Sequence, residues 1–456
     1  MRIERDSLGP VRVPDQAYYG AQTARAVANF PISGVRQHLE LIHAYATVKK
    51  AAATANMRIH ALDRRRGQAI VRAADEVVRG RHDREFVVDV FQAGAGTSTN
   101  MNLNEVIANR AEELLGGKKG RYRLVHPNDH VNRSQSTNDT YHATVHVASR
   151  LETEKLLRAL RLLQRTLEAK AREFKSVVKI GRTHLQDALP ITLGQEFSGY
   201  AAALGKGIRV VAQMNDLLLE LPLGGTAIGT GVNAPKGYAQ AVVRETCRLT
   251  GQRFRVARNY FSCHQSPNAE AELSGALRAV AIELGKIVDD LILLSSGPNA
   301  GLREIILPAV QPGSSIMPGK VNPGIAEMVN MVSFRVLGND LAVSQAAAAG
   351  QLELNVYTPV ISYNLLESIK LLTHASLVFE EKCLRGVQVN YLRIRSYLER
   401  NPIIATALTP RIGYERAAQA VRISYEKGLP VRDVVVQKGW LSRREADQLL
   451  RDAEPR

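Results

Sequence analysis

The sequence predicts an all-α protein, a subunit of three domains with a long central helical bundle. Hydrophobic residues make up 45% of the 456 residues and aromatic residues only 5%, and a core of aliphatic side chains suits packed helices. From Leu273 to Leu294, apolar residues recur at alternating spacings of four and three residues. This period of about 3.5 residues is typical of a long helix that packs lengthwise against others. At roughly 150 residues per domain, the length favours three domains.

The elements follow in order along the chain. Residues 1–135 form the first predicted domain, and about the first 40 of them, rich in Pro, Gly and short polar residues, should be irregular. Residues 136–391 hold the bundle, with long helices expected around 149–174, 196–220, 273–294, 325–349 and 361–380. Helices average about 11–12 residues, and much longer ones occur where neighbours bury their apolar stripe. Residues 392–456 form a small C-terminal helical domain, and Arg400-Asn401-Pro402 marks its boundary, because proline resists helix continuation.

Composition excludes several classes of protein. The formal net charge is +16, but the basic residues are spread along the chain, which predicts a solvated basic surface; the alternative is a positive field that attracts small dianions. No basic tract is interleaved with aromatic residues, so we expect no nucleic-acid partner. Cys247, Cys263 and Cys383 are far apart without a C-x-x-C pair, which favours a reducing cytoplasm. A charged N-terminus and the lack of long apolar runs predict no signal peptide and no membrane span.

Four polar segments interrupt the helical pattern and are dense in hydroxyl and amide side chains: Gln92–Asn102, His126–Asp139, Gly181–Asp187 and Gly313–Pro323. Such side chains compete with helix hydrogen bonding and therefore sit at helix ends and in loops. Helix ends also present unpaired N–H groups that bind anions, so four such loops would make a carboxylate receptor. Taken alone, the loops at Thr97 and Ser136 could equally be ordinary capped turns. The glycines and prolines of the fourth segment predict a mobile lid.

The sequence predicts no cofactor and no metal. Gly229–Ala234 fits a G-x-G-x-x-A pattern, but it follows a helical run, and no βαβ unit surrounds it, so we expect no dinucleotide there. The histidines show neither His-Glu-x-x-His spacing nor cysteine partners.

Together, the four segments resemble the fumarase/aspartase superfamily. Gly313–Pro323 looks like the signature loop of that family, and the resemblance runs from Asp6–Gly9 to Thr406–Tyr414. It implies three mostly helical domains and a homotetramer in which the central helices of four subunits form one multi-helix core. It also implies a lyase that acts on a small dicarboxylate in active sites where three subunits meet.

The resemblance assigns a role to each motif. Ser314 would be the base that takes a proton from the carbon beside a carboxylate, made basic enough by the N–H groups of its loop and by Lys320. The carboxylate that gains charge would be held by Lys320, Asn322 and Thr183. The other carboxylate would be held by Thr97, Ser136, Thr137 and Ser315.

The remaining roles concern the leaving group and a second site. Asn138 and His184 would face the leaving amine or hydroxyl, and Glu327 would orient the His184 ring. His184 has two other interpretations, a member of the acid–base relay or a structural histidine bonded to Glu327. In the fumarase branch, the turn at His126, Asn128 and Asp129 resembles a second dicarboxylate site.

The leaving group could be ammonia or water. Four flanks resemble the aspartase branch: Gln92–Ser98, Ser134–Asp139, Ala300–Ile305 and Ala349–Val356. Three stretches resemble the fumarase branch: Gly20–Thr23, Gly297–Asn299 and Thr406–Tyr414. Because the aspartase-like flanks adjoin the predicted substrate loops, we expect aspartate ammonia-lyase activity, with fumarate hydratase activity as the alternative.

Three departures from the family pattern bear on this expectation. Tyr141-His142-Ala143 replaces an aromatic-Pro-Thr sequence, Arg133 is unusual at its position, and Tyr260–His264 is atypical. The first two flank predicted substrate loops and could alter substrate scope or rate. The superfamily has also lent its fold to structural lens proteins, but the intact Ser314 and Lys320 favour an enzyme.

Overall fold

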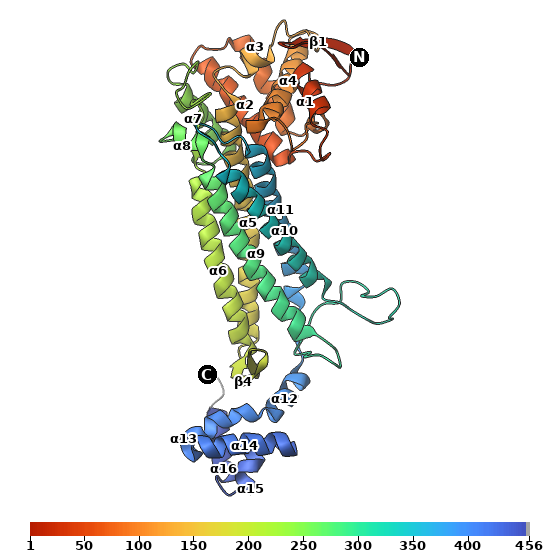
Figure 1. Cartoon of the computed structure of the whole chain (residues 1–456), viewed down its shortest axis with the longest axis vertical. Helices are drawn as coiled ribbons and strands as arrows, with labels where there is room; N and C mark the ends of the chain where they lie inside the picture. The colour runs from red at the N-terminus through yellow and green to blue at the C-terminus, as the bar shows by residue number, and fades with distance from the viewer. Residues whose placement is uncertain (453–456) are drawn as a thin grey trace. The chain divides into compact units, whose positions relative to one another are not determined.

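The computed structural model describes residues 1–452, which form α-helices and four two-stranded sheets (Figure 1). This confirms the predicted all-α class. The helices are α1 (Ala21–Asn29), α2 (Leu39–Arg58), α3 (Arg64–Val78), α4 (Thr97–Leu114), α5 (Thr137–Glu173), α6 (Leu193–Leu217), α7 (Tyr238–Thr250), α8 (Tyr260–Gln265), α9 (Asn268–Ser295), α10 (Gly324–Ala348), α11 (Thr358–Lys382), α12 (Tyr391–Arg400), α13 (Thr409–Ile412), α14 (Tyr414–Lys427), α15 (Val431–Gln437) and α16 (Arg443–Asp452). None of these helices is long and apolar enough to cross a membrane.

The strands pair locally. The antiparallel pairs are β1 (Arg2–Asp6) with β2 (Gly9–Val13), β3 (Val178–Thr183) with β4 (Gln186–Thr192), and β7 (Ile305–Ile306) with β8 (Gln388–Val389). The parallel pair is β5 (Glu220–Leu221) with β6 (Arg255–Val256).

The five predicted long helices are confirmed as α5, α6, α9, α10 and α11, although α5 begins earlier than expected, at Thr137. Its start is capped, because Asp139 Oδ1 accepts the backbone N–H of Ser136 at 2.9 Å and Ser136 Oγ accepts that of Asn138 at 3.3 Å. The Ser-x-x-Asp spacing is a capping signal that the helical prediction overlooked. The predicted substrate residues Thr137 and Asn138 therefore lie in the first turn of a helix.

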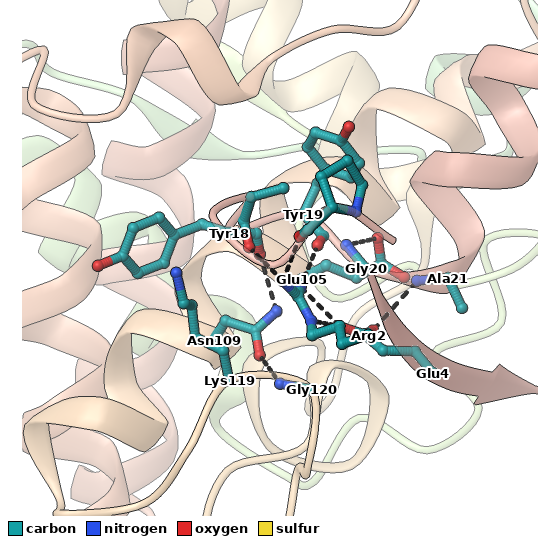
Figure 2. Close-up of polar contacts among 12 residues, drawn as sticks. Arg2, Glu4, Tyr18, Tyr19, Gly20, Ala21, Glu105, Asn109, Lys119 and Gly120 are labelled. Carbon is teal, nitrogen blue, oxygen red and sulfur yellow. Dashed lines mark hydrogen bonds and ion pairs between the residues drawn. The ribbon is translucent and has the colours of Figure 1, made fainter. Parts of the chain in front are cut away.

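The expectation of an irregular N-terminus was wrong in part. The β1–β2 hairpin and α1 occupy Arg2–Asp6, Gly9–Val13 and Ala21–Asn29, whereas residues 14–20 and 30–38 lie outside the helices and strands. Two buried carboxylates organise this segment (Figure 2). Glu105 on α4 accepts the backbone N–H of Gly20 at 2.8 Å, and Glu4 on β1 accepts that of Ala21 at 3.2 Å. The segment is thereby fixed to α4, the helix that begins at Thr97.

The chain divides into two compact units. The first comprises Met1–Leu157, Arg209–Ala281 and Phe334–Thr373, and the second comprises Arg158–Ile208, Ile282–Ser333 and the chain from His374 onward. The sequence-based division at residues 135 and 391 stays a prediction.

Each unit contains a segment of all five long helices (Figure 1). In the first unit, Ser274 on α9 donates to Asp340 on α10 at 2.7 Å. In the second, Tyr200 on α6 donates to Asp290 on α9 at 2.7 Å. The apolar residues of the predicted period on α9 are at most 4% exposed: Leu273, Leu277, Val280, Leu284, Ile287, Leu291 and Leu294. Their periodicity therefore predicted the buried face of this helix correctly.

The C-terminal residues hold an apolar cluster of their own. It includes Leu408, Ile412, Val435 and Leu441 from the segments after Pro402. α12 ends at Arg400, and the Asn401 side chain accepts the N–H of Ile403 at 3.0 Å, so a new helical segment begins after the break. The predicted break at Pro402 is confirmed.

Candidate functional site

Thr97 is the first residue of α4 in the first unit, and its side chain is exposed. The preceding turn is tight, with positive φ angles at Ala95 (58°) and Gly96 (80°). The backbone N–H of Ala95 donates to Val356 O at 2.8 Å. The backbone N–H of Thr97 donates to Gly94 O, and that of Thr99 donates to Gln92 Oε1 at 2.9 Å. At a helix start, N–H groups without helical partners can bind an anion, and here the Thr97 and Thr99 amides already have partners within the chain.

A second helix start adjoins the first. Asn100, in the first turn of α4, donates from Nδ2 to Thr137 Oγ1, on the first residue of α5, at 2.8 Å. The start of α4, which carries Thr97, thus adjoins the start of α5, which carries Thr137 and follows Ser136, within one unit. Two such ends reinforce each other electrostatically in holding a negative group.

Asn138 and Asp139 tie this helix start to the loop between β5 and α7. Asn138 Nδ2 donates to Ala227 O at 2.7 Å. The buried Asp139 accepts the backbone N–H groups of Gly224 and Thr226 at 3.0 and 3.1 Å. Burial raises the pKa of Asp139 above its ordinary value, whereas these amide bonds oppose that change.

A buried cation lies beneath the Ser136 turn and was missed from the sequence. Lys49 on α2 is 0% exposed and donates to Asn132 Oδ1 at 2.9 Å and to Gln135 Oε1 at 3.0 Å. Burial lowers the pKa of Lys49 to about 7, and the charge of Asp139 opposes this change. The available signal was weak: Lys49 lies in the alanine-rich run Ala44–Ala55, but Lys50 and two threonines lie in the same run.

In the second unit, Thr183 ends β3 and His184 opens the turn to β4, and both are exposed. His184 and Leu185 have φ angles of 55° and 59°. A two-residue turn of this type favours glycine or asparagine, and other residues there are strained. The strand before the turn is anchored, because buried Glu304 binds Lys179 at 3.0 Å and Arg182 at 2.7 Å.

The Gly313–Pro323 loop keeps Ser314, Lys320 and Asn322 on one closed segment. Gly313 donates from its backbone N–H to Lys320 O at 2.8 Å and accepts from Asn322 Nδ2 at 2.8 Å. Ser314 Oγ accepts the backbone N–H groups of Ile316 and Met317 at 3.2 and 3.0 Å. Two amide donors at one oxygen stabilise negative charge there. Ser315 and Lys320 are exposed on this loop, and a pocket of about 430 Å³ is lined in part by Ser314 and Lys320.

The predicted residues fall into two sets. The first unit holds Thr97, Ser136, Thr137 and Asn138, whereas the second holds Thr183, His184, Ser314, Ser315, Lys320, Asn322 and Glu327. Their union in one site stays a prediction. Glu327 is exposed in the first turn of α10, and within residues 1–452 it makes no hydrogen bond or ion pair with His184. The orienting contact between them therefore stays a prediction as well.

The predicted second dicarboxylate site lies in the first unit. His126 Nδ1 accepts the backbone N–H groups of Asn128 and Asp129, each at 3.3 Å. Asn128, Asp129 and Arg133 line a pocket of about 640 Å³. The polar backbone and the arginine would suit a carboxylate, and binding there stays a prediction. In the part of the chain that the structure describes, no group of three or more His, Cys, Asp or Glu side chains is placed to hold a metal ion.

Comparison with known proteins adds to this geometry. A family model described as a lyase matches residues 9–338, and one described as the fumarase C C-terminus matches residues 404–454. The chain belongs to the fumarase/aspartase superfamily. It is therefore a lyase, and the resemblance seen in the sequence is confirmed.

Relatives from both branches of the superfamily match the chain over its full length. It is 46% identical over 454 residues to an aspartate ammonia-lyase of Bacillus sp, covering 100% of this chain and 97% of that protein. It is 48% identical over 451 residues to a class II fumarate hydratase of Thermosynechococcus vestitus, covering 99% of this chain and 97% of that protein. The crystal structure of a class II fumarase from Schistosoma mansoni superimposes with a TM-score of 0.96 at 39% identity, covering 99% of this chain and 98% of that one. Overall identity thus does not choose between the two superfamily reactions.

Proposed function

We propose that this superfamily lyase is an aspartate ammonia-lyase, which reversibly eliminates ammonia from L-aspartate to give fumarate. The observation that carries the proposal is the position of the aspartase-like flanks. Val356, in the flank Ala349–Val356, accepts the N–H of Ala95 beside Thr97 at 2.8 Å. Glu304, in the flank Ala300–Ile305, binds Arg182 beside Thr183 at 2.7 Å. These flanks therefore contact the segments that carry candidate substrate residues.

Two of the three hydratase-like stretches contact other parts of the chain, whereas the third, Gly297–Asn299, directly precedes the flank Ala300–Ile305. The backbone of Gly20–Thr23 binds Glu105 and Glu4, within the N-terminal segment. Leu408 and Ile412, from the stretch Thr406–Tyr414, belong to the C-terminal apolar cluster. Catalysis depends on how the substrate is positioned, so the flanks that contact the candidate substrate segments carry more weight in our proposal.

The proposed reaction begins at Ser314. Its Oγ would take a proton from C3 of aspartate, and the electrons left on carbon would move into the neighbouring carboxylate. The two amide donors at Oγ support negative charge on this oxygen before the transfer. Lys320 and Asn322, which share its loop, and Thr183 would hold the carboxylate as its charge increases.

The second step breaks the bond between C2 and nitrogen. The electrons return from the carboxylate to form the C2–C3 double bond, and ammonia leaves while Ser314 keeps the proton. Asn138 and His184 would face the departing amine. The other carboxylate would bind Ser315 and the paired helix starts that carry Thr97, Ser136 and Thr137, because such ends attract anions.

The active enzyme would be a homotetramer with sites shared by three subunits. Met331, Phe334 and Leu341 on α10 are 63%, 67% and 62% exposed. Their spacings of three and seven residues suit one face of a helix. Large exposed apolar side chains on one helix are typical of a surface that binds another protein. A helix from a second copy of this chain would cover them, as the superfamily resemblance implies. Phe334→Asp should then reduce the oligomer measured by light scattering, whereas an unchanged tetramer would argue against this surface.

The test of the reaction is direct. Purified protein is incubated with L-aspartate or L-malate, and fumarate is followed by its ultraviolet absorbance. Fumarate from aspartate is expected. Hydration of fumarate is the second candidate, because three stretches of the sequence resemble the fumarase branch. Fumarate from malate alone would establish it in place of our proposal.

The base is tested with a matched pair of variants. Ser314→Ala should remove nearly all turnover and leave the oligomer intact. Ser7→Ala, which changes an exposed serine in the β1–β2 turn, should retain wild-type turnover. Substantial activity in Ser314→Ala would exclude this serine as the base.

A further inference from the structure

Thr226, in the loop between β5 and α7, has a strained backbone. Its φ angle is 56°, in a left-handed region that β-branched residues rarely adopt. Such a conformation persists only where surrounding groups hold it, and it is common at functional sites. The question is therefore which groups hold this turn.

Three side chains hold the turn from different elements. Asp139 on α5 accepts the N–H of Thr226 at 3.1 Å, and His264 on α8 lies with Nε2 at 2.9 Å from Thr226 O. One residue further along, Asn138 donates to Ala227 O at 2.7 Å. Both backbone polar groups of Thr226 are thus bound, and the next carbonyl is bound to a candidate substrate residue.

His264 is built into this turn. It is 0% exposed, and its other ring nitrogen, Nδ1, lies 2.6 Å from Tyr260 O. Both ring nitrogens therefore lie within hydrogen-bond distance of a backbone carbonyl oxygen. A Cβ on Gly225 would lie 2.7 Å from His264 Cε1. The loop can therefore approach the imidazole this closely only with glycine at that position.

The two atypical sequence segments meet at this histidine. His142, one turn beyond Asn138 on α5, has Nδ1 at 3.0 Å from Cys263 O, and its ring stacks with that of His264 at 6.3 Å. Burial lowers the pKa of His142 to about 4, so this ring is neutral and donates from Nδ1. His142 therefore supports α8, the helix that carries His264.

We propose that His264 is a positioning residue of the lyase reaction, which holds the Thr226 turn and, through Ala227, fixes the side-chain amide of Asn138. This inference rests on the proposed function, in which Asn138 faces the leaving group. Loss of His264 would release the turn on one side while Asp139 still holds the other. The Asn138 amide would then no longer have Ala227 O as a fixed acceptor. The leaving group would in turn face a side chain that is no longer fixed in position.

The experiment is a double-mutant cycle in the full-length enzyme with L-aspartate and L-malate. His264→Leu should lower kcat about 10- to 100-fold, since a misplacement of about 1 Å costs this much, and should change KM less than about threefold. In an Asn138→Ala background, the same substitution should cost almost nothing more, because coupled residues are not additive. His264→Gln keeps an amide donor for Thr226 O and should recover part of the rate.

The controls separate positioning from general damage. His374→Leu, at an exposed histidine on α11, should leave turnover unchanged. Equal losses from His264→Leu in the wild-type and Asn138→Ala backgrounds would overturn the inference. If His264→Leu does not fold, the cycle is run with His264→Gln, and the same comparison decides.

Hydrogen exchange gives a readout that needs no turnover. His264→Leu, or His264→Gln in its place, should speed hydrogen exchange of the backbone amides in residues 224–231. Unchanged exchange would refute the claim that His264 fixes the Thr226 turn. If the wild-type enzyme produces no fumarate from either substrate, the proposed function fails, and the role of His264 in turnover fails with it. An active wild type with an additive cycle refutes only the role of His264.

Discussion

Replacing Gly96 with alanine tests how rigidly the structure holds Thr97. The new Cβ would lie 2.2 Å from Cδ2 and 2.3 Å from Cε2 of Tyr141, where ordinary contact is 3.4–4 Å. Tyr141 is 0% exposed, and its hydroxyl lies 3.1 Å from Ser362 Oγ. Because the ring is held on all sides, the Gly96 backbone must move instead, and Thr97 must move with it.

The magnitude follows from two costs and one gain. The left-handed conformation of residue 96 costs an alanine about 1–2 kcal/mol, and overpacking in a tight core costs about 1–3 kcal/mol. Alanine also lowers the conformational entropy of the unfolded chain, which stabilises the folded state by about 0.4–1 kcal/mol. The free energy of unfolding should therefore fall by about 2–4 kcal/mol. A shift of about 1 Å at Thr97 should also lower kcat/KM about 100-fold.

Gly116→Ala is the matched control. Gly116 has a φ of 87°, and nothing lies within 4 Å of its would-be Cβ, so only the conformational cost of about 1 kcal/mol should remain. Urea unfolding followed by circular dichroism compares the stabilities, and fumarate production compares the rates. Equal unfolding midpoints and equal rates in the two variants would refute the idea that Tyr141 fixes the Thr97 turn.

Three further predictions use buried charged or titratable groups. Burial lowers the pKa of Lys49 to about 7 in the folded protein, whereas a lysine in the unfolded chain keeps its proton up to about pH 10.5. The stability of the wild type relative to Lys49→Met should therefore rise as the pH increases from about 7 to about 10.5. A difference in unfolding midpoint that stays constant over this range would contradict the prediction. Burial lowers the pKa of His142 to about 4, so wild-type stability should fall as pH drops from about 6.5 to about 4, and thermal unfolding of His142→Leu should show a smaller fall. Glu304→Gln should destabilise the fold by about 3–5 kcal/mol in thermal unfolding, because it leaves buried Lys179 short of a counter-charge, whereas Glu196→Gln, at a more exposed partner of the same lysine, should cost about 1 kcal/mol or less.

The helices were predictable because their signal is local and repeated. Seven apolar positions in one register leave little choice for the buried face of α9, and those positions are all buried in the structure. Pro402 also acts locally, since it lacks a backbone donor for a continuing helix. The superfamily motifs place candidate residues at helix ends for the same reason, as Thr97 at the start of α4 and Ser136 before α5 show.

The remaining features depend on partners distant in the sequence. Lys49 is buried because Asn132 and Gln135, more than 80 residues away, supply acceptors. The N-terminal segment is ordered because Glu105 accepts N–H groups from residues 20–23. A single sequence shows a lysine in an alanine-rich run or a glutamate in a helix, but it does not show which backbone groups will surround them.

The departures from the family pattern at His142 and Tyr260–His264 show most clearly that a single sequence does not reveal which distant residues meet in the fold. In the sequence they are two separate oddities 121 residues apart, but in the structure the ring of His142 bonds to Cys263 and stacks on His264. His142→Pro alone would remove the donor to Cys263 O, and His264→Leu alone would leave Thr226 O without its imidazole partner. Because each histidine supports the other, the free-energy costs of His142→Pro and His264→Leu should not add in thermal unfolding of the double variant. Additive costs would mean that the two histidines do not stabilise each other, although their rings lie side by side.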